Sequence, residues 1–170
     1  EALGRELLSS AKDRREHALV IQGMEGSLRP ICDVLSFTEE PEIVRLETVQ
    51  HLSTGVSGRL RDGYSLLQAV AKLHPTPALC GSPKEAARRW IADHEALDRG
   101  WYAAPIGWLA PGGAGIFAVA IRSALLRDSG ALAFGGAGIV EGSEPSMEWR
   151  ETEMKIDAVA RHILVREVPG

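Results

Sequence analysis

The chain has 170 residues, of which 45% are apolar and 25% are charged, and its formal net charge at pH 7 is −4. These totals are ordinary for a globular protein with one hydrophobic core, and the net negative charge argues against a nucleic-acid groove, which needs a basic face. The apolar runs fall short of the ~20 residues that cross a membrane, and no secretory signal opens the chain, so we expect a cytoplasmic protein with no membrane partner. Cys32 and Cys80 form no zinc spacing, so we expect both thiols to be reduced.

The first third of the chain predicts a long helix followed by a strand. Apolar residues recur at helical spacing through residues 2–29, and Pro30 ends the pattern. Because the chain begins inside this pattern and its first residue is not Met, we expect it to be a piece of a longer protein. Residues 43–61 carry β-branched and aliphatic side chains in partial alternation, which predicts a strand.

Two shorter helices are predicted next. One covers residues 64–73 and the other begins at Ser82-Pro83, with the serine as N-cap, and runs to about Leu97. The basic runs at residues 12–15 and 84–89 lie on helical patterns, and we interpret both as solvated helix faces.

Past residue 100 the chain becomes rich in glycine and aliphatic residues and predicts antiparallel strands. Three strand-like runs cover residues 102–109, 115–126 and 130–140, and turn signals separate them. A final helix is predicted from Ser146, as its N-cap, to about Leu164. Because helices and strands come in blocks, the predicted fold class is α+β, with an antiparallel meander packed against helices.

The final helix carries a candidate cation site. Glu148, Glu151 and Lys155 are three and four residues apart, so they project from one stripe of the helix. Trp149 and Ile156 belong to a second stripe that can face the core. Paired carboxylates suit Mg²⁺, which prefers oxygen ligands. The alternative is a solvated Glu–Lys pair that only supports the helix.

Three further features could bind a charged ligand, and each has a purely structural alternative. Glu16 and His17 are neighbours on the first helix, where adjacent residues do not face one direction, so at most one points into a given site and both could be exposed. The glycine-rich residues 135–138 would let a backbone approach a ligand, or would form a tight turn. Arg122 lies in an apolar strand pattern and would clamp a carboxylate if buried, or face water.

Six segments, in order, resemble the chorismate-utilising enzymes, a family that includes isochorismate, anthranilate, aminodeoxychorismate and salicylate synthases. The segments are SSAKDRREH at 9–17, LHPTPALCG at 73–81, RGWYAAPIG at 99–107, AVAIRSA at 118–124, GAGIV at 136–140 and EWRETEMK at 148–155. The resemblance runs nearly end to end here but covers only the C-terminal part of a family member. It implies that residues 1–170 are the C-terminal portion of one chorismate-binding catalytic domain, whose N-terminal portion lies outside this chain.

The resemblance also implies a magnesium site and a histidine at the reacting ring. Glu16 and Glu151 match the family's Mg²⁺ ligands, and Glu148 matches a carboxylate that assists through water. His51 matches the active-site histidine near the ring of chorismate, although a single histidine is more often structural.

A second group of positions matches residues that bind the substrate. Tyr102 and Arg122 match the pair that holds a substrate carboxylate, expected to be the enolpyruvyl one, and Lys155 matches a lysine close to the metal. Gly136 and Gly138 match backbone donors to the substrate.

The reaction that the resemblance implies is the Mg²⁺-dependent conversion of chorismate to isochorismate, in which water adds at C2 while the C4 hydroxyl leaves. Such a reaction needs a base to activate water and an acid to protonate the leaving oxygen. The family supplies these as a Lys and a Glu that are expected upstream of Glu1, so neither is assigned here. We therefore expect the 170 residues alone to bind metal poorly and to catalyse nothing.

The choice within the family depends on few residues. The segment at 73–81 is closest to isochorismate synthases of the siderophore type, which feed 2,3-dihydroxybenzoate or salicylate. Menaquinone-type members usually show a different loop. Ala78 stands where salicylate and anthranilate synthases tend to carry Thr, whose hydroxyl goes with a later loss of pyruvate. Salicylate synthase is the alternative within the class, and a non-catalytic binding fragment is the alternative of another class.

Overall fold

In the computed structural model of the chain, the structure describes residues 7–45, 50–128 and 130–163. The chain divides into two compact units. Unit 1 consists of Glu1–Ala96 and Gly107–Phe117, and unit 2 consists of Leu97–Ile106 and Ala118–Gly170.

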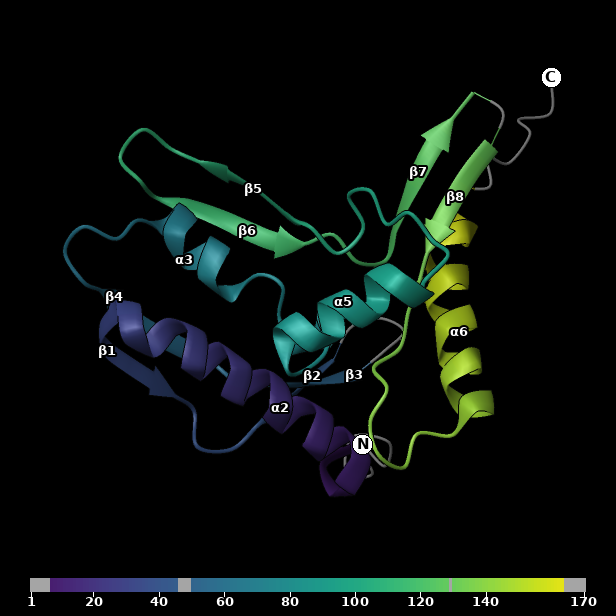
Figure 1. Cartoon of the computed structure of the whole chain (residues 1–170), viewed down its shortest axis with the longest axis horizontal. Helices are drawn as coiled ribbons and strands as arrows, with labels where there is room; N and C mark the ends of the chain where they lie inside the picture. Colours follow the sequence, from purple (N-terminus) through teal and green to yellow (C-terminus); the bar gives the residue numbers. More distant parts are fainter. Residues whose placement is uncertain (1–6, 46–49, 129, 164–170) are drawn as a thin grey trace. The chain divides into compact units, whose positions relative to one another are not determined.

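The longest helix of unit 1 among the described residues is α2, which covers Ala11–Leu28 (Figure 1). Residues 7–9 are also helical, but Ser10 takes an extended conformation and its Oγ accepts a hydrogen bond from the Asp13 N–H at 3.2 Å. This bond satisfies one of the free N–H groups at the helix start. The prediction of one continuous helix over 2–29 is therefore wrong at Ser10, and its first residues lie outside those described.

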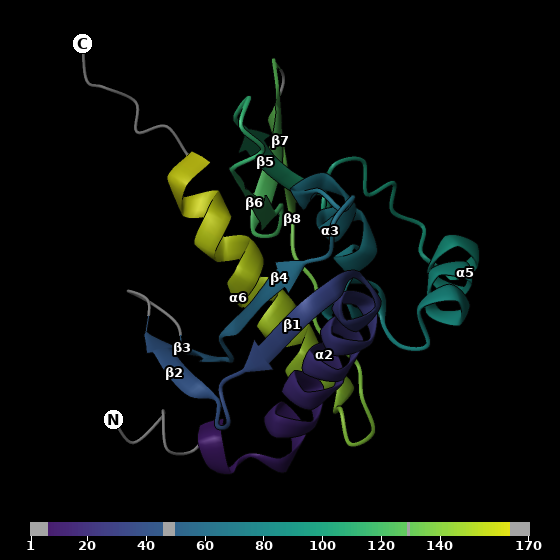
Figure 2. The same ribbon diagram turned by 90° about the vertical axis from the view of Figure 1, so that its left-hand side faces the viewer.

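Four strands follow in unit 1, as two antiparallel pairs (Figure 2). Strand β1 (Cys32–Phe37) pairs with β4 (Val56–Leu60), and β2 (Glu42–Arg45) pairs with β3 (Gln50–Ser53). The predicted single strand over 43–61 is thus three short strands, and β1 was not predicted.

Three further α-helices of unit 1 lie between residues 66 and 94. Helix α3 covers Leu66–Leu73, close to the prediction, and Ser65 and Gln68 close a capping box at its start. The short helix α4 covers Pro77–Cys80, and α5 covers Lys84–His94. Pro83 is the N-cap of α5 and no side chain caps it, so the predicted cap at Ser82 and the predicted end at Leu97 are both wrong.

The core of unit 1 lies where the end of α2 meets β1 and α3. Its buried members are Leu28, Ile31, Cys32 and Ala69, and Leu73 packs against them. Leu28 is the last residue of α2 and Cys32 the first of β1, so this core fixes the C-terminal end of α2 to the strand that follows. Burial of these side chains stabilises the unit by roughly 1.5–3 kcal/mol for each large one.

Strands β5 (Pro105–Leu109) and β6 (Gly115–Val119) form a two-stranded sheet, and so do β7 (Ser123–Arg127) and β8 (Gly130–Phe134). The predicted run over 115–126 is therefore two strands. Ala120–Arg122 interrupts it, and Arg122 has a φ of 50°, a left-handed conformation that no strand contains. The prediction that Arg122 lies within a strand is wrong.

The final helix, α6, covers Pro145–Ile163 and packs against β8 in unit 2 (Figure 1). It begins one residue before the predicted cap at Ser146. Ile156 faces the residue that follows β8, since its side chain lies beside Gly135. Trp149 does not face the core as predicted, because it is 67% exposed.

The predicted α+β class is confirmed by these helices and antiparallel strand pairs. Many large apolar side chains of the described residues remain exposed, among them Trp108 and Ile116 in the β5–β6 pair and Leu125 and Leu132 in the β7–β8 pair. No helix in the described part of the chain has the length and apolar character that crossing a membrane requires.

Candidate functional site

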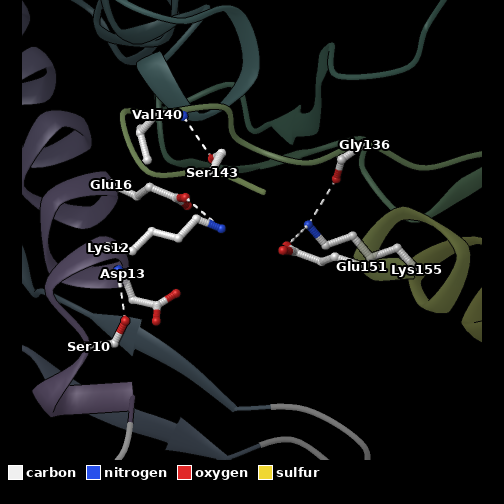
Figure 3. A network of polar contacts seen from close by, with 9 residues as sticks. All are labelled: Ser10, Lys12, Asp13, Glu16, Gly136, Val140, Ser143, Glu151 and Lys155. Carbon is white, nitrogen blue, oxygen red and sulfur yellow. Dashed lines mark hydrogen bonds and ion pairs between the residues drawn. The ribbon is translucent and has the colours of Figure 1, made fainter. Parts of the chain in front are cut away.

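Lys155 of α6 links two predicted site residues in unit 2 (Figure 3). Its ammonium group donates one hydrogen bond to the carbonyl oxygen of Gly136 at 2.9 Å and another to Oε1 of Glu151 at 2.7 Å. Glu151 and Lys155 are one helical turn apart, so the helix itself brings them together. The bond to Gly136 spans 19 residues and attaches the glycine-rich segment to α6.

Tyr102 joins the same cluster from the other side of Gly136. Its ring stacks on Phe134, the last residue of β8, with centroids 5.3 Å apart. A Cβ atom on Gly136 would lie 3.0 Å from the Tyr102 hydroxyl oxygen, which is closer than ordinary packing allows. Glycine at 136 thus lets the phenol lie against the backbone.

A backbone connection places Tyr102 close in the fold to the segment that carries Arg122. Ala103 donates its N–H to the carbonyl of Ala120 at 2.9 Å, and the N–H of Ala120 bonds to the carbonyl of Ala104 at 2.8 Å. Ala103 is buried and has a φ of 69°. These bonds hold the turn after Tyr102 against a residue two positions before Arg122.

Arg122 lies at the edge of an open groove of about 360 Å³ between β7 and the end of α6. Its backbone is left-handed, which costs a non-glycine residue about 1–2 kcal/mol. The hydrogen bonds at Ala120 keep the chain in this conformation. The Arg is half-buried, between the two alternatives that its sequence context left open.

Glu148 is the most buried charged residue among those that the structure describes, with 5% of its surface exposed. It borders a second groove of about 350 Å³, which Ile139, Ser143, Trp149 and Thr152 also line. The loop across this groove is fixed by a hydrogen bond from the Val140 N–H to Ser143 Oγ at 3.1 Å (Figure 3). A carboxylate this buried needs a cation or hydrogen bonds to offset its charge.

In unit 1, Glu16 projects from α2 beside Lys12, whose ammonium nitrogen lies 3.5 Å from Glu16 Oε1 (Figure 3). Both side chains are 31% exposed. The interpretation of the basic run 12–15 as a solvated face is therefore too simple, because Lys12 balances the charge of a predicted metal ligand. The sequence signal for this pair is the spacing of four residues on one helix.

His17, next to Glu16, makes a separate contact within unit 1. Its Nε2 lies 2.7 Å from the Thr54 hydroxyl, which follows β3. Burial lowers the pKa of His17 below its ordinary value of 6.5. Burial therefore favours the neutral imidazole, which forms its hydrogen bond with the Thr54 hydroxyl through Nε2.

The lowered pKa of His17 predicts that the protein loses stability as the pH falls below about 6.5. The unfolded chain binds a proton there before the folded chain does, so the contribution of His17 is fully present above this pH and is lost towards the folded pKa. We expect His17→Gln to flatten the pH dependence of urea unfolding between pH 7.5 and 5.5. His94→Gln, at an exposed position of α5, is the control. An equally steep dependence in the His17 variant would contradict this assignment.

Residues 1–164 match the family described as chorismate binding enzyme. The chain belongs to this family. Among the curated relatives is the salicylate biosynthesis isochorismate synthase of Pseudomonas aeruginosa, which is 48% identical over 92% of this chain and 33% of its own length. Another is the isochorismate synthase MenF of Bacillus subtilis, 44% identical over 91% of this chain and 33% of its own length. The chain thus spans about a third of the length of these relatives.

Solved structures of proteins similar in sequence share the fold. The putative 2,3-dihydroxybenzoate-specific isochorismate synthase DhbC of Bacillus anthracis has a TM-score of 0.90 at 38% identity, over 97% of this chain and 44% of that one. Anthranilate synthase component I of Streptococcus pneumoniae has a TM-score of 0.85 at 32% identity, over 94% and 37% of the two chains. Fold similarity therefore does not separate the activities within the family.

The three residues expected to hold magnesium are all glutamates, one in unit 1 and two in unit 2. Glu148 and Glu151 present two carboxylates from one stripe of α6, and Glu16 presents one from α2. Carboxylate oxygens are the ligands that Mg²⁺ prefers. Within the described residues, no three His, Cys, Asp or Glu side chains are grouped at metal-binding distances. The magnesium site stays a prediction.

Three other predicted positions lie outside these contacts. His51 is exposed on β3, opposite Val44 of β2. Ala78 is exposed on α4, and Gly138 is exposed in the segment after β8. The roles of all three stay predictions.

Proposed function

We propose that this chain is the C-terminal part of a Mg²⁺-dependent isochorismate synthase, which converts chorismate to isochorismate. Membership of the chorismate-binding family supports this, and so do the relatives at 40–48% identity that carry the name isochorismate synthase. The observation that carries the proposal is the connected cluster of Tyr102, Gly136, Lys155 and Glu151 in unit 2. This cluster combines groups that can donate hydrogen bonds to an anion, such as the Tyr102 hydroxyl, with the Glu151 carboxylate, which can bind a cation.

The charges of the site suit a dianionic substrate. Arg122 and Tyr102 bind one substrate carboxylate, because a guanidinium and a phenol can both donate hydrogen bonds to it. Lys155 holds the Gly136 carbonyl in place and orients the Glu151 carboxylate. Because Gly136 and Gly138 have no side chains, the substrate can approach the backbone of these residues closely.

Glu16, Glu148 and Glu151 would hold the magnesium ion, which would supply positive charge to orient the second carboxylate and offset its charge. In the reaction, water adds at C2 and the C4 hydroxyl leaves. His51 lies near the reacting ring. The general base and the general acid belong to the upstream part of the enzyme, so the residues of this chain bind and orient the substrate and its cation.

The upstream part of the same enzyme is the proposed partner of this chain. The relatives are about three times as long, and the strands described here expose large apolar side chains such as Trp108 and Leu125. Exposed apolar patches of this kind mark surfaces that another part of a protein covers. We expect the 170 residues alone to convert no chorismate.

A second candidate is salicylate synthase, which would also eliminate pyruvate. Ala78 favours the first proposal, because the hydroxyl that goes with pyruvate loss is absent from this position. A siderophore pathway is preferred over a menaquinone pathway, since the relative at 48% identity is named for salicylate biosynthesis.

The test is the product that the full-length enzyme forms from chorismate. We expect isochorismate, with no pyruvate released, and we expect a chelator to stop turnover until Mg²⁺ is restored. Pyruvate with an aromatic acid would establish the second candidate instead. Binding of chorismate without turnover in the presence of Mg²⁺ would favour a non-catalytic binding module.

A further inference from the structure

The segment 74–81, called here the Ala78 loop, is fixed at three points within unit 1. It connects α3 to α5 and contains α4, and α4 contacts both α2 and α5. Ala78 lies at the centre of this loop, so contacts that fix the loop also fix Ala78. In the proposed function, Ala78 is the residue whose lack of a hydroxyl favours isochorismate over loss of pyruvate.

The first point is the ammonium group of Lys84, which donates a hydrogen bond of 2.7 Å to the carbonyl oxygen of His74. Lys84 is the first residue of α5 and is half-buried, so the solvated face predicted for residues 84–89 is wrong at this residue. A cation is disfavoured in the first turn of a helix, where the dipole is positive. The bond to His74 offsets that cost and gives the residue a specific role.

The second point is the contact between Pro77 and Gly23 of α2. A Cβ atom on Gly23 would lie 2.5 Å from Pro77 Cγ and 2.9 Å from Pro77 Cδ, so only glycine fits here. Glycine in a helix interior costs about 1 kcal/mol relative to alanine. Gly26, three residues further along α2, has no atom within 4 Å of its Cβ position.

The third point is Gly81, which ends the loop with a φ of 91°, a conformation that favours glycine. Its Cβ position lies 3.0 Å from Cβ of Ala87 in α5.

Gly23 lies on the same helix as Glu16, the predicted metal ligand of α2. Glu16 and Gly23 are seven residues apart, which is close to two helical turns, so they lie on one face of α2 about 10 Å apart along its axis. We propose that Gly23 and Lys84 are positioning residues that hold the Ala78 loop on the Glu16 face of α2. This inference rests on the proposed function, in which Glu16 binds the metal and Ala78 adjoins the substrate.

The experiment on Gly23 uses Gly26 as a matched control in the full-length enzyme. Both Gly→Ala changes should stabilise α2 equally through helix propensity, but only Gly23→Ala forces Pro77 away. We expect Gly23→Ala to lower kcat for chorismate about tenfold to 100-fold, because small displacements at a site have effects of that size. Gly26→Ala should retain kcat. Equal kcat in the two variants would overturn the role of Gly23.

The experiment on Lys84 compares Lys84→Met with Lys84→Arg and with the exposed control Lys72→Met. We expect Lys84→Met to lower kcat about tenfold or more, Lys84→Arg to restore most of it, and the half-saturating Mg²⁺ concentration to stay unchanged, since Glu16 lies on α2 and not on the loop. Combining Lys84→Met with Ala78→Thr should change the ratio of pyruvate to isochorismate non-additively. Additive effects, or full activity of Lys84→Met, would overturn its role.

Hydrogen exchange separates failure of this inference from failure of the proposed function. If the unchanged enzyme does not use chorismate, the proposed function fails, and exchange at residues 74–81 then decides the role of the loop contacts. Faster exchange at residues 74–81 in both Gly23→Ala and Lys84→Met, relative to their controls, supports the inference. Unchanged exchange there overturns it.

Discussion

Replacing Glu151 with glutamine is expected to abolish Mg²⁺-dependent turnover of chorismate while the fold stays intact. Glutamine keeps the size of the side chain but removes the negative charge that a divalent cation requires. Loss of a residue that merely supports a metal ligand costs about 10- to 100-fold in affinity or activity, so loss of a ligand should cost at least the upper value. The measurements are kcat at saturating Mg²⁺ and direct titration of Mg²⁺ binding.

The ion pair between Glu151 and Lys155 does not make this change a folding mutation. The Glu151 side chain is 42% exposed, and exposed pairs of this kind contribute only about 0–1 kcal/mol. Thermal unfolding of Glu151→Gln should therefore resemble that of the unchanged enzyme. Glu153→Gln removes the same charge from an exposed position of α6 and should keep full activity. Normal Mg²⁺ binding and turnover in Glu151→Gln would refute the metal assignment.

The second large effect is expected from Arg122→Ala, which should raise the Michaelis constant for chorismate about 10- to 150-fold. This range corresponds to the 1.5–3 kcal/mol of a hydrogen bond to a charged group. Alanine adopts the left-handed conformation at 122 with about the same strain as arginine, so the backbone should keep its shape.

Arg127→Ala provides the control for this change, because Arg127 is exposed at the end of β7, five residues further along the chain. Steady-state kinetics at several chorismate concentrations would distinguish a change in the Michaelis constant from a change in kcat. An unchanged Michaelis constant in Arg122→Ala would exclude the carboxylate clamp.

The sequence predicted the elements that local signals specify. Helix α3 was predicted within two residues of its start, and the final helix begins one residue from its predicted cap. The break at Ser10 was missed, because the apolar periodicity continues across it and hides a capping residue inside a longer pattern. Strand β1 was missed because it follows the helix end directly, after a single 3₁₀ turn at Arg29–Ile31.

The sequence could not predict the turn at Arg122, because the cause is not local. Residues 116–121 read as one apolar strand, and no glycine marks the left-handed position. Ala120 instead exchanges hydrogen bonds with Ala103 and Ala104, some 16 residues away, and the strand ends at Val119. Tertiary pairing of this kind overrides the local pattern.

The candidate site was predicted in two different ways. Helical spacing alone identified Glu148, Glu151 and Lys155 as neighbours, and the structure gives the Glu151–Lys155 contact at 2.7 Å. Helical spacing could not predict the hydrogen bond between Lys155 and Gly136, which are 19 residues apart. The family resemblance identified both residues as site residues but did not predict that they contact each other. The positioning contacts of Lys84 and Gly23 had no signal in the sequence, since each depends on a residue that the fold brings near.

Tyr102 stacks on Phe134, the last residue of β8, and this contact links ligand binding at Tyr102 to the stability of the β7–β8 hairpin. Strands β7 and β8 form a sheet of only two strands, and such a sheet is marginally stable on its own in water. A molecule that binds to Tyr102 and Gly136 in their ordered arrangement must also strengthen the hairpin, because binding to the folded form shifts its opening equilibrium. Occupancy of the site should therefore be visible as slowed amide exchange along β8.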